Sequence, residues 1–219
     1  MANGKKIINF QTKDGVKIIG DFFDAKSKKS VLLLHILPGS RIDFSEFADF
    51  LFANSYNVLN IDERGHGESE AWPGEMGSWQ EFTQSDYDKT IYDVEAALQW
   101  LSNRIPETEL AIIGGSIGAN LAFLYGAKSQ PKIVVAMSPG LNYKGIKTEI
   151  ASRNFRQNLL LIASHDDNYS FESSKRLFEI SAAEKKEFIK YENAGHGTRM
   201  FNTEPELKQR ILDFLNKIV

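Results

Sequence analysis

A serine between glycines is the residue whose setting points most directly to chemistry. Ser116 stands in the stretch 114–118, which reads Gly-Gly-Ser-Ile-Gly. Apolar residues typical of a strand precede it and a helical pattern follows, so Ser116 falls at a strand-to-helix junction. Small residues allow the sharp turn that exposes a serine hydroxyl, and the following helix can stabilise a negatively charged oxygen. These features predict a nucleophilic serine; the alternative is a plain turn in which Ser116 caps the helix.

A nucleophilic serine needs a base, and the base needs an acid that orients it. His196 lies between two glycines, just after the last predicted strand. Asp166 and Asp167 directly follow the apolar run 159–163. Serine, acid and histidine therefore occur in this order, each after its own predicted strand, which favours a catalytic triad over a helix cap.

The other three histidines have settings that indicate structural roles. His35 ends an apolar strand and His66 lies in an Arg-Gly-His-Gly stretch. His165 precedes the two aspartates and is interpreted as a loop residue. Histidine is often partly buried in folded proteins, so none of the three needs a catalytic explanation.

Short, nearly continuous apolar runs alternate with helical patterns along the chain, as in parallel sheets covered by helices on both faces. The predicted strands of this kind are 31–35, 58–61, 110–113, 133–137, 159–163 and 187–191. The predicted helices are 44–53, 86–101, 116–127, 171–183 and 206–218. A Gly-bearing turn joins two further β-rich runs, 7–12 and 16–23. We therefore predict an α/β fold with a doubly wound, mostly parallel eight-stranded sheet, an N-terminal antiparallel hairpin and helices on both faces.

Composition narrows the class of protein. The 219 residues are 42% hydrophobic, enough for one core, and we expect residues 1–219 to form a single domain. A net charge of -3 with scattered Lys and Arg argues against a nucleic-acid surface. No stretch approaches the roughly 18 apolar residues of a membrane span, and no signal core begins the chain, so we expect a cytoplasmic protein. The chain has no cysteine, which excludes thiolate sites, and we expect neither a metal nor a cofactor.

Over nearly its whole length, residues 31–219, the chain resembles the α/β-hydrolase family. The resemblance rests on 114–118, on the Gly-His-Gly stretch 195–197, and on 61–69, which is similar to that family's D-x-R-G-x-G-x-S stretch. It implies a serine hydrolase with the α/β-hydrolase fold, in which 61–69 is a structural loop. Branches of the family that use an aspartate nucleophile are excluded by the serine at position 116.

The stretch 35–39, His-Ile-Leu-Pro-Gly, is similar to the family's H-G-x-P-G oxyanion loop. It departs from that pattern because Ile36 stands where the family has glycine. The resemblance implies that the backbone N–H of Ile36 or Leu37, together with that of Ile117, forms the oxyanion hole.

The resemblance also favours one of the two carboxylates as the acid and indicates how open the site is. In the family pattern, the spacing from the acid to the following helix, predicted at 171–183, favours Asp166, with Asp167 as the alternative. Many family members insert a helical cap after the sixth strand, but the corresponding span 138–158 is too short for a large cap domain. We therefore expect a comparatively open site.

The expected activity is hydrolysis of carboxylic esters or thioesters of small to medium acyl groups, through an acyl-enzyme on Ser116. A second long loop, residues 63–84, contains four large apolar residues: Trp72, Met76, Trp79 and Phe82. They could form an apolar wall for the acyl group, or they could simply pack that loop down. The alternatives are an acyltransferase with the same triad and a non-catalytic member of the fold that binds a small ligand. The expected partner is a small-molecule ester or thioester.

Overall fold

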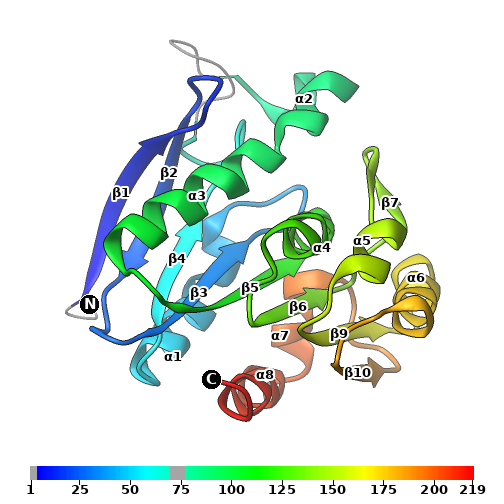
Figure 1. Cartoon of the computed structure of the whole chain (residues 1–219). Coiled ribbons are helices and arrows are strands. Elements are labelled where there is room, and N and C mark those ends of the chain that lie inside the picture. The colour runs from blue at the N-terminus through cyan, green and yellow to red at the C-terminus, as the bar shows by residue number, and fades with distance from the viewer. Residues whose placement is uncertain (1–3, 70–76) are drawn as a thin grey trace.

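One eight-stranded sheet forms the centre of the computed structural model, which describes residues 4–69 and 77–219 (Figure 1). The strand order is β1-β2-β4-β3-β5-β6-β9-β10. The strands are β1 (Lys5–Gln11), β2 (Lys17–Phe23), β3 (Lys29–Leu34), β4 (Asn57–Ile61), β5 (Glu109–Gly115), β6 (Ile133–Met137), β9 (Asn158–Ser164) and β10 (Lys185–Tyr191). The six strands from β4 to β10 in this order pair in parallel, whereas β1 and β2 form an antiparallel hairpin that joins the edge of β4. The predicted fold class is confirmed.

Helices cover both faces of this sheet (Figure 1). The helices are α1 (Ser45–Ala53), α2 (Gln84–Lys89), α3 (Ile91–Arg104), α4 (Ile117–Ser129), α5 (Glu149–Asn154), α6 (Asn168–Ile180), α7 (Met200–Thr203) and α8 (Leu207–Asn216). Short 3-10 helices are η1 (Arg41–Phe44), η2 (Trp79–Glu81) and η3 (Gly197–Arg199). The apolar residues of α3, α4 and α5 pack on one face, and those of α1 and α8 pack on the other.

Each continuous apolar run of the sequence contributes side chains to the cores on both faces of the sheet. Along β3, Leu32 and Leu34 belong to the core under α3 and α4, whereas Val31 and Leu33 belong to the core under α1 and α8. All four side chains are fully buried. A strand with apolar residues on only one face could not occupy this position between two helical layers.

The predicted helix 86–101 is in fact two helices, α2 and α3. Thr83 begins α2 early, because its backbone N–H and its hydroxyl both donate to the Asp86 carboxylate, at 2.9 and 2.6 Å. Thr90 separates the two helices, and its hydroxyl donates to the Tyr87 carbonyl at 2.7 Å. Such a bond from a β-branched side chain to the preceding turn bends a helix and is not visible in an apolar period.

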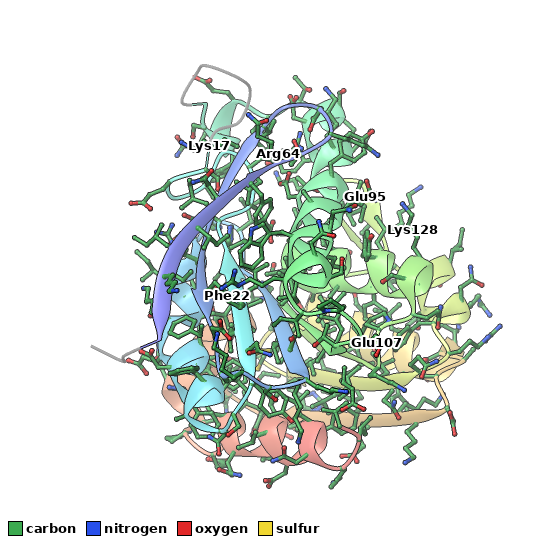
Figure 2. All side chains as sticks on the ribbon, turned by 60° about the vertical axis from the view of Figure 1, so that its left-hand side comes forward. Lys17, Phe22, Arg64, Glu95, Glu107 and Lys128 are labelled. Carbon is green, nitrogen blue, oxygen red and sulfur yellow. The ribbon has the colours of Figure 1, made fainter. Side chains whose placement is uncertain are left out.

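Ion pairs join neighbouring helices at the surface of the same layer. Glu95 of α3 and Lys128 of α4 lie next to each other in Figure 2 and form an ion pair. Lys13, from the turn between β1 and β2, also reaches Glu95, at 2.9 Å. In the described ranges 4–69 and 77–219, no helix is both long enough and apolar enough to cross a membrane.

Candidate active site

Ser116 lies at the junction of β5 and α4, as its sequence context predicts. Its backbone has φ 53° and ψ -118°, outside the conformations that a non-glycine residue favours. Hydrogen bonds fix it there: the Ser116 N–H donates to the Met137 carbonyl at 2.8 Å, and the Asn120 N–H donates to the Ser116 carbonyl at 3.2 Å. A strained residue held by its surroundings at a strand-to-helix turn is typical of a functional position.

Two glycines make this turn possible by allowing backbones to come close together. A Cβ atom on Gly114 would lie 2.2 Å from the carbonyl oxygen of Gly118. A Cβ atom on Gly118 would lie 2.4 Å from the carbonyl oxygen of Leu34, at the end of β3. Both contacts are with backbone, which cannot move aside as a side chain can. The glycines of the motif are therefore required by packing around Ser116.

His196 is held by Asp167. The Nδ1 atom of His196 lies 2.6 Å from Oδ2 of Asp167, and the imidazole is 29% exposed. Burial raises the pKa of Asp167, but hydrogen bonds from His196, Ser170 and Ser138 outweigh it and hold the pKa below its ordinary value. Asp167 is therefore ionised at neutral pH and can stabilise a protonated His196.

The preference for Asp166 as the partner of His196 is wrong. The Asp166 carboxylate accepts hydrogen bonds from the Ser164 hydroxyl and, at 3.2 Å, from the Gly195 N–H. It therefore anchors the loop that carries His196 without contacting the imidazole. The error lies in the start of α6, which begins at Asn168 with Asp167 as its N-terminal cap residue, three residues before the predicted start.

The structure distinguishes the two residues, Ile36 and Leu37, whose backbone N–H was predicted as the first donor of the oxyanion hole. Leu37 lines the pocket that contains Ser116, together with Ile117 at the start of α4. Ile36 is buried, and its side chain approaches Gly115 and Gly197 instead. Within the described part of the chain, neither the N–H of Ile36 nor that of Leu37 makes a hydrogen bond. The pocket lining therefore favours Leu37 over Ile36 as the donor beside Ile117.

The pocket at Ser116 has a volume of about 270 Å³ and is lined by Leu37, Ser116, Ile117, Tyr143, Lys144 and His196. Of the predicted apolar wall, the two described residues, Trp79 and Phe82, are not part of this lining. Trp79 stacks on His66 at a ring distance of 5.7 Å, and Phe82 packs edge-on against Tyr87. These two aromatic residues pack down the loop that follows β4. Trp72 and Met76, the other two predicted wall residues, lie outside the described residues.

A small hairpin that the sequence analysis missed supplies the polar wall of the pocket. It consists of β7 (Asn142–Tyr143) and β8 (Ile146–Lys147), and it lies within the span 138–158. Lys144 and Gly145 form its turn with φ of 50° and 84°, the left-handed pair required by a tight two-residue turn. The glycine after Lys144 was the available signal, but strands of two residues have no apolar pattern to support it.

The remaining histidines have structural surroundings. His35 is fully buried: its Nε2 accepts from the Glu63 N–H at 3.0 Å, so its Nδ1 carries the proton, which it donates to the Ile36 carbonyl. Burial, with His66 nearby, lowers the pKa of His35 to about 3. Nδ1 of His66 bonds to the Arg64 carbonyl at 2.9 Å. Exposed His165 stacks on Phe171.

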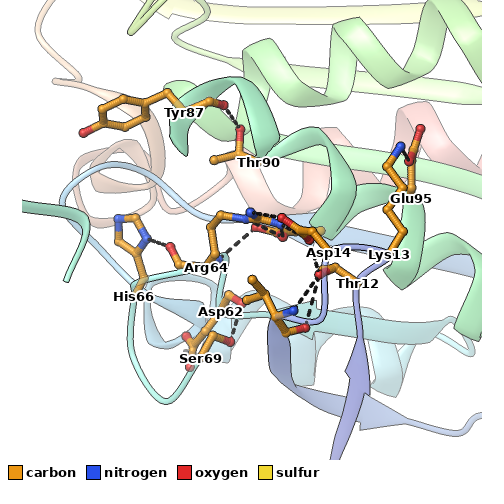
Figure 3. A network of polar contacts seen from close by, with 12 residues as sticks. Thr12, Lys13, Asp14, Asp62, Arg64, His66, Ser69, Tyr87, Thr90 and Glu95 are labelled. Carbon is orange, nitrogen blue, oxygen red and sulfur yellow. Dashed lines mark hydrogen bonds and ion pairs between the residues drawn. The ribbon is translucent and has the colours of Figure 1, made fainter. Parts of the chain in front are cut away.

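The loop after β4 takes part in a group of polar and charged residues that we call the Arg64 cluster: Asp14, Asp62, Arg64, His66 and Asp93. Figure 3 shows Asp14, Asp62, Arg64 and His66 from close by. The guanidinium of Arg64 is 2% exposed and bonds to Asp93 at 2.9 Å and to Asp14 at 2.8 Å. Asp62 is buried and pairs with Arg41. This is the structural loop that the resemblance implies.

Comparisons with known proteins identify the family and the fold of this chain. The family described as serine aminopeptidase, S33 (Hydrolase_4), matches residues 25–157. A serine hydrolase-like protein of Dictyostelium discoideum is 29% identical over 134 residues, which is 61% of this chain. The chain spans only 34% of the length of that relative.

Solved structures of esterases and related hydrolases have the same fold. The esterase Pf2001 of Pyrococcus furiosus is 25% identical, with a TM-score of 0.81 over 98% of this chain and 92% of its own. A dienelactone hydrolase of Anabaena variabilis, 16% identical, has a TM-score of 0.74 over 99% of this chain and 97% of its own. The chain has the α/β-hydrolase fold and belongs to the serine aminopeptidase S33 family.

Proposed function

We propose that this protein hydrolyses carboxylic esters or thioesters of small acyl groups through an acyl-enzyme on Ser116. The observation that carries the proposal is the position of His196, which Asp167 holds at 2.6 Å in the same pocket as Ser116. The esterase of Pyrococcus furiosus supports the reaction class, because its structure is similar over nearly the whole of both chains. The pocket volume of about 270 Å³ favours small acyl groups.

In the proposed reaction, His196 takes the Ser116 proton while the serine oxygen attacks the acyl carbonyl. The carbonyl oxygen becomes negatively charged and receives hydrogen bonds from the backbone N–H groups of Leu37 and Ile117. His196 then gives its proton to the leaving alcohol or thiol. Water, deprotonated by His196, attacks the acyl-enzyme, and release of the carboxylic acid restores Ser116. Asp167 stays ionised throughout and stabilises the charged imidazole.

A fluorophosphonate probe tests the nucleophile directly. We expect the native protein to gain one adduct, located at Ser116 by peptide mass spectrometry, and Ser116→Ala to gain none. A series of p-nitrophenyl esters from acetyl to dodecanoyl should then show kcat/KM falling beyond short chains. A native protein that is unlabelled and turns over none of these esters would favour the ligand-binding alternative. Product analysis with an added alcohol separates hydrolysis from acyl transfer.

A further inference from the structure

The hydroxyl group of Tyr143 lies inside the proposed active site and has no role in the reaction described so far. Tyr143 lines the pocket, and its ring is edge-on to the His196 imidazole, with centroids 6.3 Å apart. Its hydroxyl lies 2.7 Å from the Ser170 hydroxyl, and Tyr143 lines the same pocket as Ser116. Ser170 in turn lies 3.4 Å from Nδ1 of His196. The hydroxyl groups of Tyr143 and Ser170 thus form a pair beside the proposed triad.

The hairpin that carries Tyr143 is fastened to α6. The Tyr169 hydroxyl accepts from the Asn142 N–H at 3.0 Å and donates to the Asn142 carbonyl at 3.1 Å. The rings of Tyr143 and Tyr169 pack edge to face, 5.5 Å apart. Because Ser170 follows directly in α6, the same helix turn fixes both the backbone of the hairpin and the Tyr143 hydroxyl. The phenol is therefore held in place before substrate arrives.

The Tyr143 hydroxyl is a donor at neutral pH. Burial raises the pKa of Tyr143 to about 12, although its hydrogen bond with Ser170 acts in the opposite direction. In the pair of hydroxyl groups formed by Tyr143 and Ser170, either group can be the donor. When Ser170 is the donor, the phenol proton is free to point into the pocket.

We propose that Tyr143 is a further catalytic residue, whose hydroxyl donates a hydrogen bond to the leaving-group oxygen as the ester bond breaks. This inference rests on the proposed function. The leaving oxygen must lie within reach of His196, because the imidazole protonates it, and within bonding distance of the carbon attached to Ser116. Tyr143 lies beside both residues. It keeps its own proton throughout: the proton on the departing alcohol comes from His196 and originates on Ser116.

The expected signature is a dependence on the leaving group. An ethoxide-like oxygen carries much negative charge as it departs and gains most from a donor, whereas a nitrophenolate delocalises that charge. A thiolate sulfur is a weak acceptor and also gains little. Loss of the phenol should therefore slow the cleavage of alkyl esters selectively.

The test compares Tyr143→Phe with the native protein on ethyl butyrate, p-nitrophenyl butyrate and S-ethyl thiobutyrate, which share one acyl group. We measure kcat/KM because it reports acylation, the step in which the leaving group departs. We expect about a 10- to 100-fold loss on the ethyl ester and less than about 3-fold on the other two. Tyr125→Phe is the matched control, since it removes a phenol hydroxyl outside this pocket, and it should change all three substrates alike.

Equal losses on all three substrates, or no loss on the ethyl ester, would overturn the role of Tyr143. Tyr143→Met provides a second variant if Tyr143→Phe does not fold: it also removes the phenol and should reproduce the selective loss on the ethyl ester. The proposed function is assessed separately on the native protein, by its fluorophosphonate labelling and its p-nitrophenyl butyrate turnover. If the native enzyme is labelled and turns over p-nitrophenyl butyrate, but Tyr143→Phe shows no selective loss on the ethyl ester, only this inference is overturned.

Discussion

Two groups of Asp, His and other polar side chains lie near the carboxyl ends of the strands, and they differ in how deeply their central side chain, Arg64 or His196, is buried. In the Arg64 cluster, the guanidinium of Arg64 is paired with two carboxylates and is almost entirely buried. In the second group, which we call the Ser116 cluster (Ser116, Tyr143, Asp167, Ser170 and His196), His196 is bonded on one side and open to a pocket on the other.

This difference teaches how the same residue types serve structure in one place and chemistry in another. His35, beside the Arg64 cluster, uses both ring nitrogens for backbone groups and cannot take a proton from a substrate. His196 uses only Nδ1 for Asp167 within the described structure, which leaves Nε2 for the reacting groups. A free ring nitrogen facing a pocket, rather than the presence of histidine, separates the two regions.

The largest effect should come from breaking the contact between His196 and Asp167. Asp167→Asn keeps the shape but presents an amide that no longer orients the imidazole or stabilises its charge, so we expect kcat to fall about 10³- to 10⁴-fold. Asp166→Asn is the matched control, one residue away, and its carbonyl can still accept from Gly195. Its kcat should stay within about 3-fold of the native value, measured on p-nitrophenyl butyrate. The reverse ranking would restore Asp166 as the acid.

Breaking an ion pair in the Arg64 cluster should lower the stability of the protein. Asp93 is buried and bonds to the backbone N–H and the Nε of Arg64, both at 2.9 Å. Asp93→Asn leaves the guanidinium with Asp14 as its one charged partner in the described cluster, so we expect a loss of about 2–4 kcal/mol in the free energy of unfolding. Urea denaturation measures it. Exposed Asp88→Asn is the control and should change this energy by less than about 0.5 kcal/mol.

A smaller effect should appear as pH falls. The pKa of His35 is about 3 in the folded protein and about 6.5 when the chain is unfolded. Between these values the unfolded state binds the proton and the folded state does not, so acidification favours unfolding. The contribution of His35 to the free energy of unfolding should fall by up to roughly 1.4 kcal/mol per pH unit.

Urea midpoints from pH 7 to pH 4 check this for the native protein and for His35→Gln. The glutamine variant should be less stable at pH 7 yet lose less stability on acidification. If His35→Gln keeps the native slope, His35 is not the group that binds the proton on unfolding.

The sheet and the turn that carries Ser116 could be predicted from sequence because each leaves a local pattern. Buried parallel strands such as β6 and β9 appear as unbroken apolar runs, and the turn at Ser116 requires small residues at fixed positions. The start of α6 has no comparable signal. Its first residues are polar, so the apolar period begins three residues late and moves the acid from Asp167 to Asp166.

The pocket could not be predicted for a different reason. Tyr143 and Ser170 are 27 residues apart in the chain and meet only through the packing of a hairpin against α6. Aromatic residues near the site could pack down a loop or line a cavity, and composition does not separate these cases. Trp79 and Phe82 do the first and Tyr143 does the second.

The hairpin of β7 and β8 carries one wall of the pocket on six residues outside the main sheet. Besides its bonds to α6, it is joined to the core by Ile146, whose carbonyl accepts from Asn120 of α4 at 2.8 Å. Ser116 and His196 are supported by the sheet and do not depend on this segment for their backbone geometry. Substrate preference can therefore evolve, or be engineered, by substitutions at the hairpin turn around Lys144, while Tyr143, Ser116 and His196 are retained.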